Sequence, residues 1–377
     1  MKRILVVKLA DLGDLLTATP ALRALRNAHP AAHIAALVSP GSAVALTGSS
    51  VVDQVITFDK HAFDRPGQAG LSLPAALGLA RRLGAERWDA IALLHHLITP
   101  FGIAKYAALC LASGAAVRAG LDNGRGWFLT HSAPDGGFGS RHEVDHWLAV
   151  AATLGGRNRE PRLELPLSQE DLDWATSTLG RLGRDGSESV VIHPGSGGFS
   201  VARRWPAERF GAVADRLAER HGLRPLVLWG PAPGERALAE QVARLARAAI
   251  DALEPAPSPQ ALAALLARVS LFVGNDSGVV HLAAAVQTPI VAIFGPSNHS
   301  AWCPYPPDSP RHAVVREPVA CSPCIYRGHS LGTPQGCPAR TCLDLIDPDE
   351  VVQAAERVLA AQPAPNGAPA VPAGKAS

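Results

Sequence analysis

The sequence predicts an α/β protein made of two Rossmann-like units. The chain has 377 residues, which is more than one ordinary domain holds. Short β-rich runs alternate with amphipathic helical stretches, as in parallel sheets covered by helices. The second half of the chain then shows the same alternation as the first. These three observations together favour two parallel sheets in one chain.

Composition excludes several classes of protein. Hydrophobic residues make up 47% of the chain and charged residues 18%, which is enough for sizeable cores. The 35 basic and 33 acidic residues give a net charge of +2, so a nucleic-acid partner is not expected. No apolar run approaches the roughly 18 residues that span a bilayer, and Lys8 and Asp11 interrupt the apolar start, unlike a signal peptide. We therefore expect a cytoplasmic protein with reduced cysteines.

The first half contains the elements of one such unit. Strands are expected at 3–8, 33–38, 55–58, 89–94 and 116–120. Amphipathic helical segments are expected at 15–27, 73–83 and 142–154. The polar, turn-rich stretch 155–166 follows, and we interpret it as a linker. The N-terminal domain is therefore placed at 1–160.

The second half repeats the scheme. Strands are expected at 189–193, 226–229, 271–273 and 290–294. Pro206 opens a helix that ends at Gly222, and Ser258-Pro259 begins another as N-cap and first residue. The C-terminal domain is therefore placed at 161–360, with a cysteine-rich loop at 321–342. Residues 361–377 are rich in Pro, Ala and Gly and are expected to be a disordered tail.

The first candidate site follows the first strand. Gly13 allows a sharp turn, and Asp14 stands at a helix start at the carboxyl edge of the expected sheet, where ligands bind in such folds. The alternative is that Asp14, or Asp11, only caps the helix.

The second candidate is the loop 194–200. The backbone N–H groups of Gly195, Ser196 and Gly197 can face an anion, and Arg203 or Arg204 can bind a phosphate. The spacing fits neither a P-loop nor a GxGxxG motif. The alternative is an ordinary loop with two solvated arginines.

The third candidate is the segment 272–297. Its strand runs into Asn275-Asp276-Ser277-Gly278, so the N–H groups of Ser277 and Gly278 point at a diphosphate position at a helix start. Asp276 can accept hydrogen bonds from sugar hydroxyls, and His281 lies one turn later, although a lone helix histidine is more often structural. Glu235 follows another strand end and either binds a ribose hydroxyl or favours the helix dipole.

The fourth candidate is a group of cysteines. Cys321, Cys324, Cys337 and Cys342 follow the pattern C-x2-C-x12-C-x4-C, a spacing that suits a tetrahedral Zn or Fe site. The alternatives are scattered thiols that line a loop, or a redox pair.

Four motifs together resemble glycosyltransferase family 9, the ADP-heptose-using heptosyltransferases of lipopolysaccharide core assembly. They are KLADLGDLLTATPALRAL, RHEVDHWLAVAATLG, HPGSGGFSVARRWPAERF and FVGNDSGVVHLAAAVQTPIVAIFGPS. The resemblance implies a GT-B fold, in which two Rossmann-like domains face each other across a cleft. The N-terminal domain then takes the acceptor and the C-terminal domain takes the nucleotide sugar.

The resemblance also implies roles for single residues. Asp14 inherits the role of general base, and Arg203 stands where the family commonly has a diphosphate-neutralising lysine, a role that Arg204 can share. Asp276, Ser277, Gly278 and His281 inherit donor contacts, and Glu235 maps less securely to a nucleotide contact. Ala10 stands where many members have serine, which leaves acceptor detail open.

The expected reaction is inverting heptosyl transfer from ADP-heptose to a hydroxyl of a lipopolysaccharide core saccharide. The acceptor is then lipid-linked or another saccharide, with the enzyme peripheral to the inner membrane. No cofactor is needed for catalysis, and a metal at the cysteines is structural; some relatives that glycosylate autotransporter adhesins carry a cysteine-ligated iron. A protein or secondary-metabolite acceptor is one alternative, and a non-catalytic nucleotide-sugar-binding scaffold is another.

Overall fold

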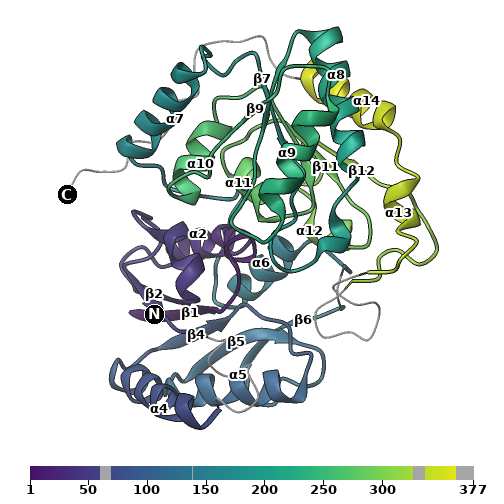
Figure 1. Ribbon diagram of the computed structural model, residues 1–377. Coiled ribbons are helices and arrows are strands. Elements are labelled where there is room, and N and C mark those ends of the chain that lie inside the picture. Colours follow the sequence, from purple (N-terminus) through teal and green to yellow (C-terminus); the bar gives the residue numbers. More distant parts are fainter. Residues whose placement is uncertain (60–68, 138, 326–335, 362–377) are drawn as a thin grey trace. The chain divides into compact units, whose positions relative to one another are not determined.

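A computed structural model describes residues 1–59, 69–137, 139–325 and 336–361 of the chain, with the backbone alone at 69–73 (Figure 1). The chain divides into two compact units, Met1–Glu164 and Leu165–Ser377. The boundary lies inside the polar stretch 155–166. The tail expected at 361–377 lies outside the described residues except for Ala361, and so does 326–335 of the cysteine-rich loop.

The described part of the first unit contains a parallel sheet in the order β3-β2-β1-β4-β5-β6. Its strands are β1 (Arg3–Lys8), β2 (His33–Val38), β3 (Gln54–Thr57), β4 (Ala90–Leu93), β5 (Val117–Asp122) and β6 (His131–Pro134). This is the Rossmann order, in which the direction of strand addition reverses between β1 and β4. The five expected strands are confirmed. The short edge strand β6 was not expected, because its sequence HSAP has no apolar run.

The helices of the first unit differ from expectation near the N-terminus. They are α1 (Leu12–Leu16), α2 (Thr19–Ala28), the 3-10 helix η1 (Pro40–Leu46), α4 (Ala69–Ala85), α5 (Pro100–Ala112) and α6 (Glu143–Thr153). The single helix expected over 15–27 is wrong, because α1 and α2 are separate. Pro20 has no N–H for the Leu16 carbonyl, which instead accepts from the Thr19 hydroxyl at 2.7 Å. The break sets α1 apart as a short helix directly after β1.

The second unit repeats the same sheet order. Its described strands are β7 (Ser189–His193), β8 (Arg224–Val227), β9 (Asp251–Ala252), β10 (Leu271–Asn275), β11 (Ile290–Ile293) and β12 (His312–Val315). They pair in parallel in the order β12-β11-β10-β7-β8-β9, so the reversal here lies between β7 and β10. The two units therefore have equivalent positions for a ligand at the carboxyl ends of their central strands.

The described helices of the second unit are α7 (Gln169–Arg181), the 3-10 helix η2 (Val201–Arg203), α8 (Ala207–His221), α9 (Glu235–Leu245), α10 (Pro259–Leu266), α11 (Gly278–Ala285), α12 (His299–Trp302), α13 (Thr341–Asp344) and α14 (Pro348–Ala360). Two of them, α8 and α10, were expected from the sequence, and their terminal signals are found at the ends of these helices. Gly222 ends α8 in the left-handed conformation at φ 64°, and the Ser258 hydroxyl caps α10 by accepting from the Ala261 N–H.

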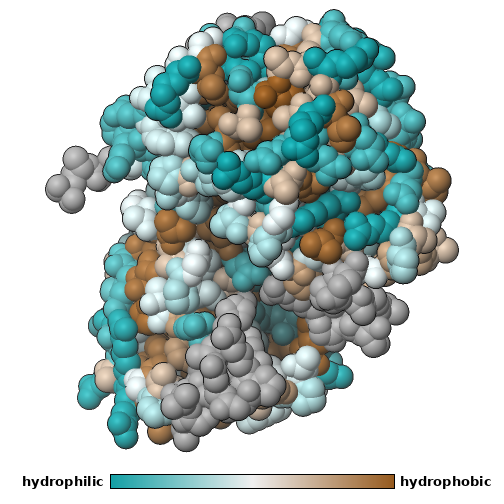
Figure 2. Space-filling view, in the orientation of Figure 1, coloured by the Kyte–Doolittle hydropathy of each residue, from teal (hydrophilic) through white to brown (hydrophobic). Residues whose placement is uncertain are grey.

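Each unit has its own apolar core, which fixes the strand ends that carry the candidate residues. Leu5, Leu37 and Leu93 are fully buried in the first core, and Ile192 and Val273 in the second. On the face shown in Figure 2, hydrophilic residues are interspersed with hydrophobic ones. Among the described residues, no helix combines the length and apolarity that a bilayer span requires.

Candidate functional site

The candidate residues cluster at the reversal point of each sheet. In the first unit, Asp14 follows the central strand β1. In the second unit, the loop 194–200 follows β7, and Asp276 follows β10. The carboxyl ends of parallel strands at such a point form the ligand crevice of Rossmann-like folds.

Asp14 lies in the first turn of α1 and is partly exposed. Asp11, not Asp14, occupies the N-cap position of this helix, and its side chain makes no capping hydrogen bond. The Thr17 hydroxyl donates to the Asp14 carbonyl at 2.8 Å and accepts from Trp147 Nε1 at 3.2 Å. These bonds anchor the end of α1 to α6. The role of Asp14 as general base stays a prediction.

Glu235 is a buried carboxylate of the second unit that three backbone amides hold in place. Its side chain is 2% exposed and lies at the first residue of α9. One carboxylate oxygen accepts from the N–H groups of Ser196 at 3.0 Å and Gly197 at 2.8 Å, and the other accepts from the Gly230 N–H at 2.9 Å. In this structure, two of the three amides that we expected to face a phosphate, those of Ser196 and Gly197, therefore donate to a carboxylate of the same chain.

The electrostatics of Glu235 follow from these contacts. Burial alone would raise the pKa of this carboxyl, but the neighbouring His193 and the amides of Gly230 and Gly197 lower it to about 2. His193 Nε2 lies 3.8 Å from the carboxylate, and the Arg204 guanidinium lies 3.6 Å from it. Glu235 is thus a fixed negative charge that organises the loop 194–200.

Arg203 joins the loop to the start of α11. Its guanidinium donates to the Asp276 carboxylate at 3.1 Å and to the Ser196 carbonyl at 2.7 Å. Asp276 is 5% exposed, and the adjoining Ser277 is the N-cap residue of α11. Since Arg204 also donates to the Ser196 hydroxyl at 3.3 Å, both arginines converge on one loop residue.

The remaining donor candidates are on α11. Gly278 is its first residue, and His281 is buried one turn later. The His281 ring faces the Trp302 ring edge-on, with 6.2 Å between the ring centroids. The structure therefore brings the loop 194–197, both arginines, Glu235 and the start of α11 into one region of the second unit. The ligand contacts assigned to these residues stay predictions.

Two residues of this region were missing from the set predicted by sequence. Asn275 is fully buried; its amide donates to the Pro194 carbonyl at 2.7 Å, and its side-chain oxygen accepts from the Trp205 N–H at 3.1 Å. His193 contacts both Glu235 and the Ser277 hydroxyl, 3.3 Å away. Each is a polar residue at the end of a buried strand. That position is the sequence feature from which both residues could have been predicted.

The four cysteines are all described, although 326–335 between them is not. Burial and then the neighbouring thiols Cys324, Cys337 and Cys321 raise the pKa of Cys342 to about 11. Among the described residues, however, it is His96, Glu143 and His146 that place three possible ligand atoms within 4.8 Å of one another, so metal binding by the cysteines stays a prediction.

Comparison with known proteins decides the class. The model of glycosyltransferase family 9 (heptosyltransferase) matches residues 76–333. The chain belongs to glycosyltransferase family 9. It is 29% identical to lipopolysaccharide heptosyltransferase 1 of Escherichia coli K12 over 304 residues, which cover 78% of this chain and 88% of that relative.

Solved structures agree with the family 9 assignment. A family 9 glycosyltransferase of Veillonella parvula superposes with a TM-score of 0.76 at 25% identity, covering 96% of this chain and 98% of that one. E. coli heptosyltransferase WaaC with ADP-2-deoxy-2-fluoro heptose superposes with a TM-score of 0.68 at 21% identity, covering 94% and 99%. The expected GT-B fold is therefore confirmed, and this family 9 member is a glycosyltransferase.

Proposed function

We propose that this family 9 enzyme transfers a heptose from ADP-heptose to a hydroxyl of a lipopolysaccharide core saccharide, with inversion at the anomeric carbon. The similarity to lipopolysaccharide heptosyltransferase 1 supports the acceptor class, and the structural neighbour with an ADP-heptose analogue supports the donor. The observation that carries the proposal is the buried group formed by Arg203, Asp276 and the start of α11 at the reversal point of the second sheet.

The second unit binds the donor in this proposal. The pyrophosphate lies against the N–H groups of Ser277 and Gly278, where the helix dipole favours negative charge. Arg203, with Arg204 beside it, neutralises the charge that grows on the departing ADP. Asp276 and His281 contact the sugar, and Glu235 contacts the nucleotide or holds the loop that does so.

The first unit binds the acceptor, and Asp14 is the general base. As the acceptor oxygen bonds to the anomeric carbon, its proton passes to the Asp14 carboxylate, and the bond between that carbon and the phosphate oxygen breaks. ADP leaves with the bonding electron pair. Because one displacement occurs from the face opposite the leaving group, the configuration inverts. No cofactor takes part in these steps.

A donor panel tests the proposal directly. Nucleotide release is measured from ADP-heptose, UDP-sugars and GDP-sugars in the presence of lipopolysaccharide core acceptor. We expect acceptor-dependent release from ADP-heptose, because the site is assigned to ADP. Equal or faster release from a UDP- or GDP-sugar would overturn the donor assignment.

A parallel acceptor panel separates the possible acceptors. Truncated lipopolysaccharide cores are compared with an autotransporter adhesin as the protein acceptor, using ADP-heptose in both cases. Transfer to the saccharide supports the proposed function, whereas transfer to the adhesin alone would replace it. We also propose that the enzyme binds peripherally to the inner membrane. Co-sedimentation of the protein with inner-membrane vesicles tests this binding.

We further propose that Cys321, Cys324, Cys337 and Cys342 hold a structural Zn or Fe ion. Their spacing follows C-x2-C-x12-C-x4-C, and four thiolates are a tetrahedral donor set for either metal. Metal emission spectra of the purified chain are expected to show this ion, and the double variant Cys321→Ser/Cys324→Ser is expected to lose it. Unchanged metal content in that variant would contradict the proposal.

A further inference from the structure

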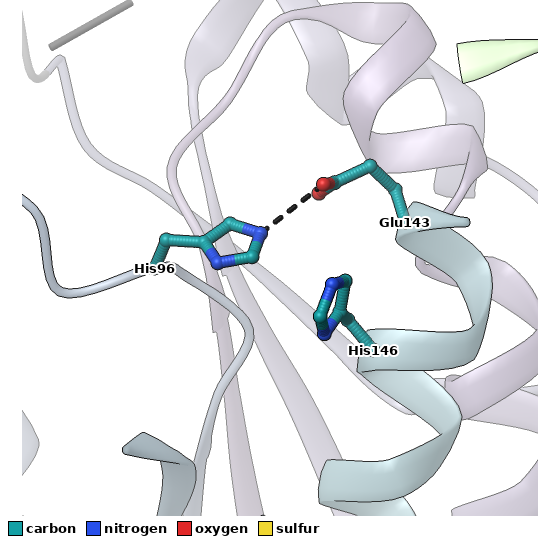
Figure 3. Close-up of side chains that lie close together, drawn as sticks. All are labelled: His96, Glu143 and His146. Atoms are coloured by element: carbon teal, nitrogen blue, oxygen red, sulfur yellow. Dashed lines mark hydrogen bonds and ion pairs between the residues drawn. The ribbon is translucent and has the colours of Figure 1, made fainter. Parts of the chain in front are cut away.

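A second cluster of potential metal ligands lies in the first unit, apart from the residues discussed above. His96 follows β4, and Glu143 and His146 lie on the first turn of α6 (Figure 3). One possible ligand atom of each lies within 4.8 Å of the others. His96 Nε2 is 3.1 Å from the Glu143 carboxylate. The rings of His96 and His146 pack edge to face, with 4.9 Å between their centroids. Two imidazoles and a carboxylate thus point at one position.

The cluster is buried, which distinguishes it from a chance group of surface acids. The side chains of His96 and Glu143 are 6% and 2% exposed, and His146 is fully buried. Neither ring nitrogen of His146 has a hydrogen-bond partner among the residues that the structure describes. A buried polar group without a partner costs stability, so His146 points to a ligand that the protein-only structure does not contain.

Asp135 completes the arrangement behind His96. Its carboxylate lies 2.9 Å from His96 Nδ1 and is 3% exposed. A metal-bound histidine commonly donates its second ring N–H to a carboxylate in this way, which fixes the ring orientation. Asp135 and Glu143 also concentrate negative charge around His96, because their carboxylates lie 2.9 Å and 3.1 Å from its two ring nitrogens.

We propose that His96, Glu143 and His146 bind a divalent transition-metal ion, with Zn²⁺ as the best match, and that Asp135 supports His96 from behind. Two imidazoles and one carboxylate are a known three-ligand set for zinc, and they leave a fourth position for water or a substrate oxygen. Bond lengths of about 2.0–2.1 Å place tetrahedral donor atoms about 3.4 Å apart, so separations of up to 4.8 Å between the ligand atoms need to shorten by up to about 1.4 Å around the ion.

The site also lies near the helix that carries Asp14. The centroids of the His96 and Trp147 rings lie 5.4 Å apart. Trp147 Nε1 in turn donates to the Thr17 hydroxyl at the end of α1. One aromatic ring therefore separates the cluster from α1. An ion at this position would fix the ends of β4 and α6 beside the residue proposed as base, without replacing it.

Cobalt titration tests the proposal, because Co²⁺ reports its ligands by visible absorption. The full-length Cys321→Ser/Cys324→Ser variant serves as the parent, since it removes competing thiolates. We expect one Co²⁺ per chain with d–d bands but no thiolate charge-transfer band, and displacement by Zn²⁺. Asp135→Asn is expected to weaken binding by about 10–100-fold, and His146→Ala by more.

Controls separate the site from adventitious binding and from misfolding. His131→Ala removes an exposed histidine of the neighbouring strand β6 and is expected to bind like the parent. Glu143→Gln removes a ligand with little change in shape, so it serves if circular dichroism shows that His146→Ala is unfolded. Absence of stoichiometric cobalt in the folded parent, or unchanged binding in folded Glu143→Gln, would overturn the proposal.

Discussion

At the scale of single residues, Asp14 and Glu235 are both carboxylates at strand ends, but their surroundings differ. Asp14 is partly exposed on a short helix, as a residue that meets an acceptor hydroxyl must be. Glu235 is buried and accepts three backbone hydrogen bonds, with its pKa lowered to about 2. A carboxylate held in this way is a poor base at neutral pH. This difference supports the proposal that Asp14 is the proton acceptor and that Glu235 is a positioning group.

Replacing Asp14 tests that division. We expect Asp14→Asn to lower the rate of heptosyl transfer by about 10²–10⁴-fold, because the amide cannot take the acceptor proton. ADP binding, measured by calorimetry, is expected to stay near that of the parent, since the donor residues lie in the other unit. Asp11→Asn, which changes the exposed N-cap residue of the same helix, is the matched control. Turnover of Asp14→Asn close to that of the control would reject Asp14 as base.

Glu235 gives the pH prediction. Its pKa is about 2 in the folded chain and about 4.5 in the unfolded chain, so the unfolded state binds the proton more readily. This stabilisation is present above pH 4.5 and is lost as the pH falls toward 2. The pKa difference corresponds to about 3 kcal/mol in the free energy of unfolding. Denaturant unfolding between pH 5 and 2 measures this contribution. The free energy of unfolding should fall less steeply with falling pH in Glu235→Gln than in the parent. It should fall as in the parent in Glu254→Gln, a control at an exposed residue.

At the scale of elements, the loop 194–200 depends on the close approach of Glu235. A Cβ atom added at Gly195 would lie 2.5 Å from the carboxyl carbon of Glu235, whereas one added at Gly198 meets nothing within 4 Å. We expect Gly195→Ala to cost about 1–3 kcal/mol of stability and to weaken ADP binding, because the loop must move away from Glu235. Gly198→Ala is expected to be near neutral. Thermal unfolding and calorimetry check both, and equal behaviour of the two variants would contradict this account of the loop.

The same scale shows what sequence patterns can predict. Buried runs such as 3–8 and 189–193 gave their strands at the observed bounds, because burial on both faces selects continuous apolar sequence. The break between α1 and α2 depends on a single proline, which the apolar periodicity of 15–27 hides. The cluster of His96, Glu143 and His146, with Asp135 behind His96, was not predicted at all. Its residues come from three elements, and only the tertiary fold brings them together.

At the scale of the whole molecule, two units with the same strand order carry different chemistry at equivalent places. The reversal point of the first sheet presents Asp14 and the histidine cluster. That of the second presents Arg203, Glu235 and Asp276. Equivalent topology therefore does not assign the substrates. The charges support the proposed assignment: two arginines beside a helix start suit a diphosphate, and a carboxylate suits a hydroxyl that must lose its proton.

Hydrogen exchange with and without ADP tests this assignment on the intact chain. Bound ADP is expected to slow amide exchange in the segments 193–204 and 275–281 of the second unit, because binding suppresses local opening. At 100 times the dissociation constant, ADP should add about 2.7 kcal/mol to the stability of the part that binds it. Arg203→Ala is expected to need more ADP for the same protection, because a direct charge contact to the diphosphate is lost. Protection confined to residues 9–17 would instead place the nucleotide on the first unit. The assignment of donor and acceptor to the two units would then be reversed.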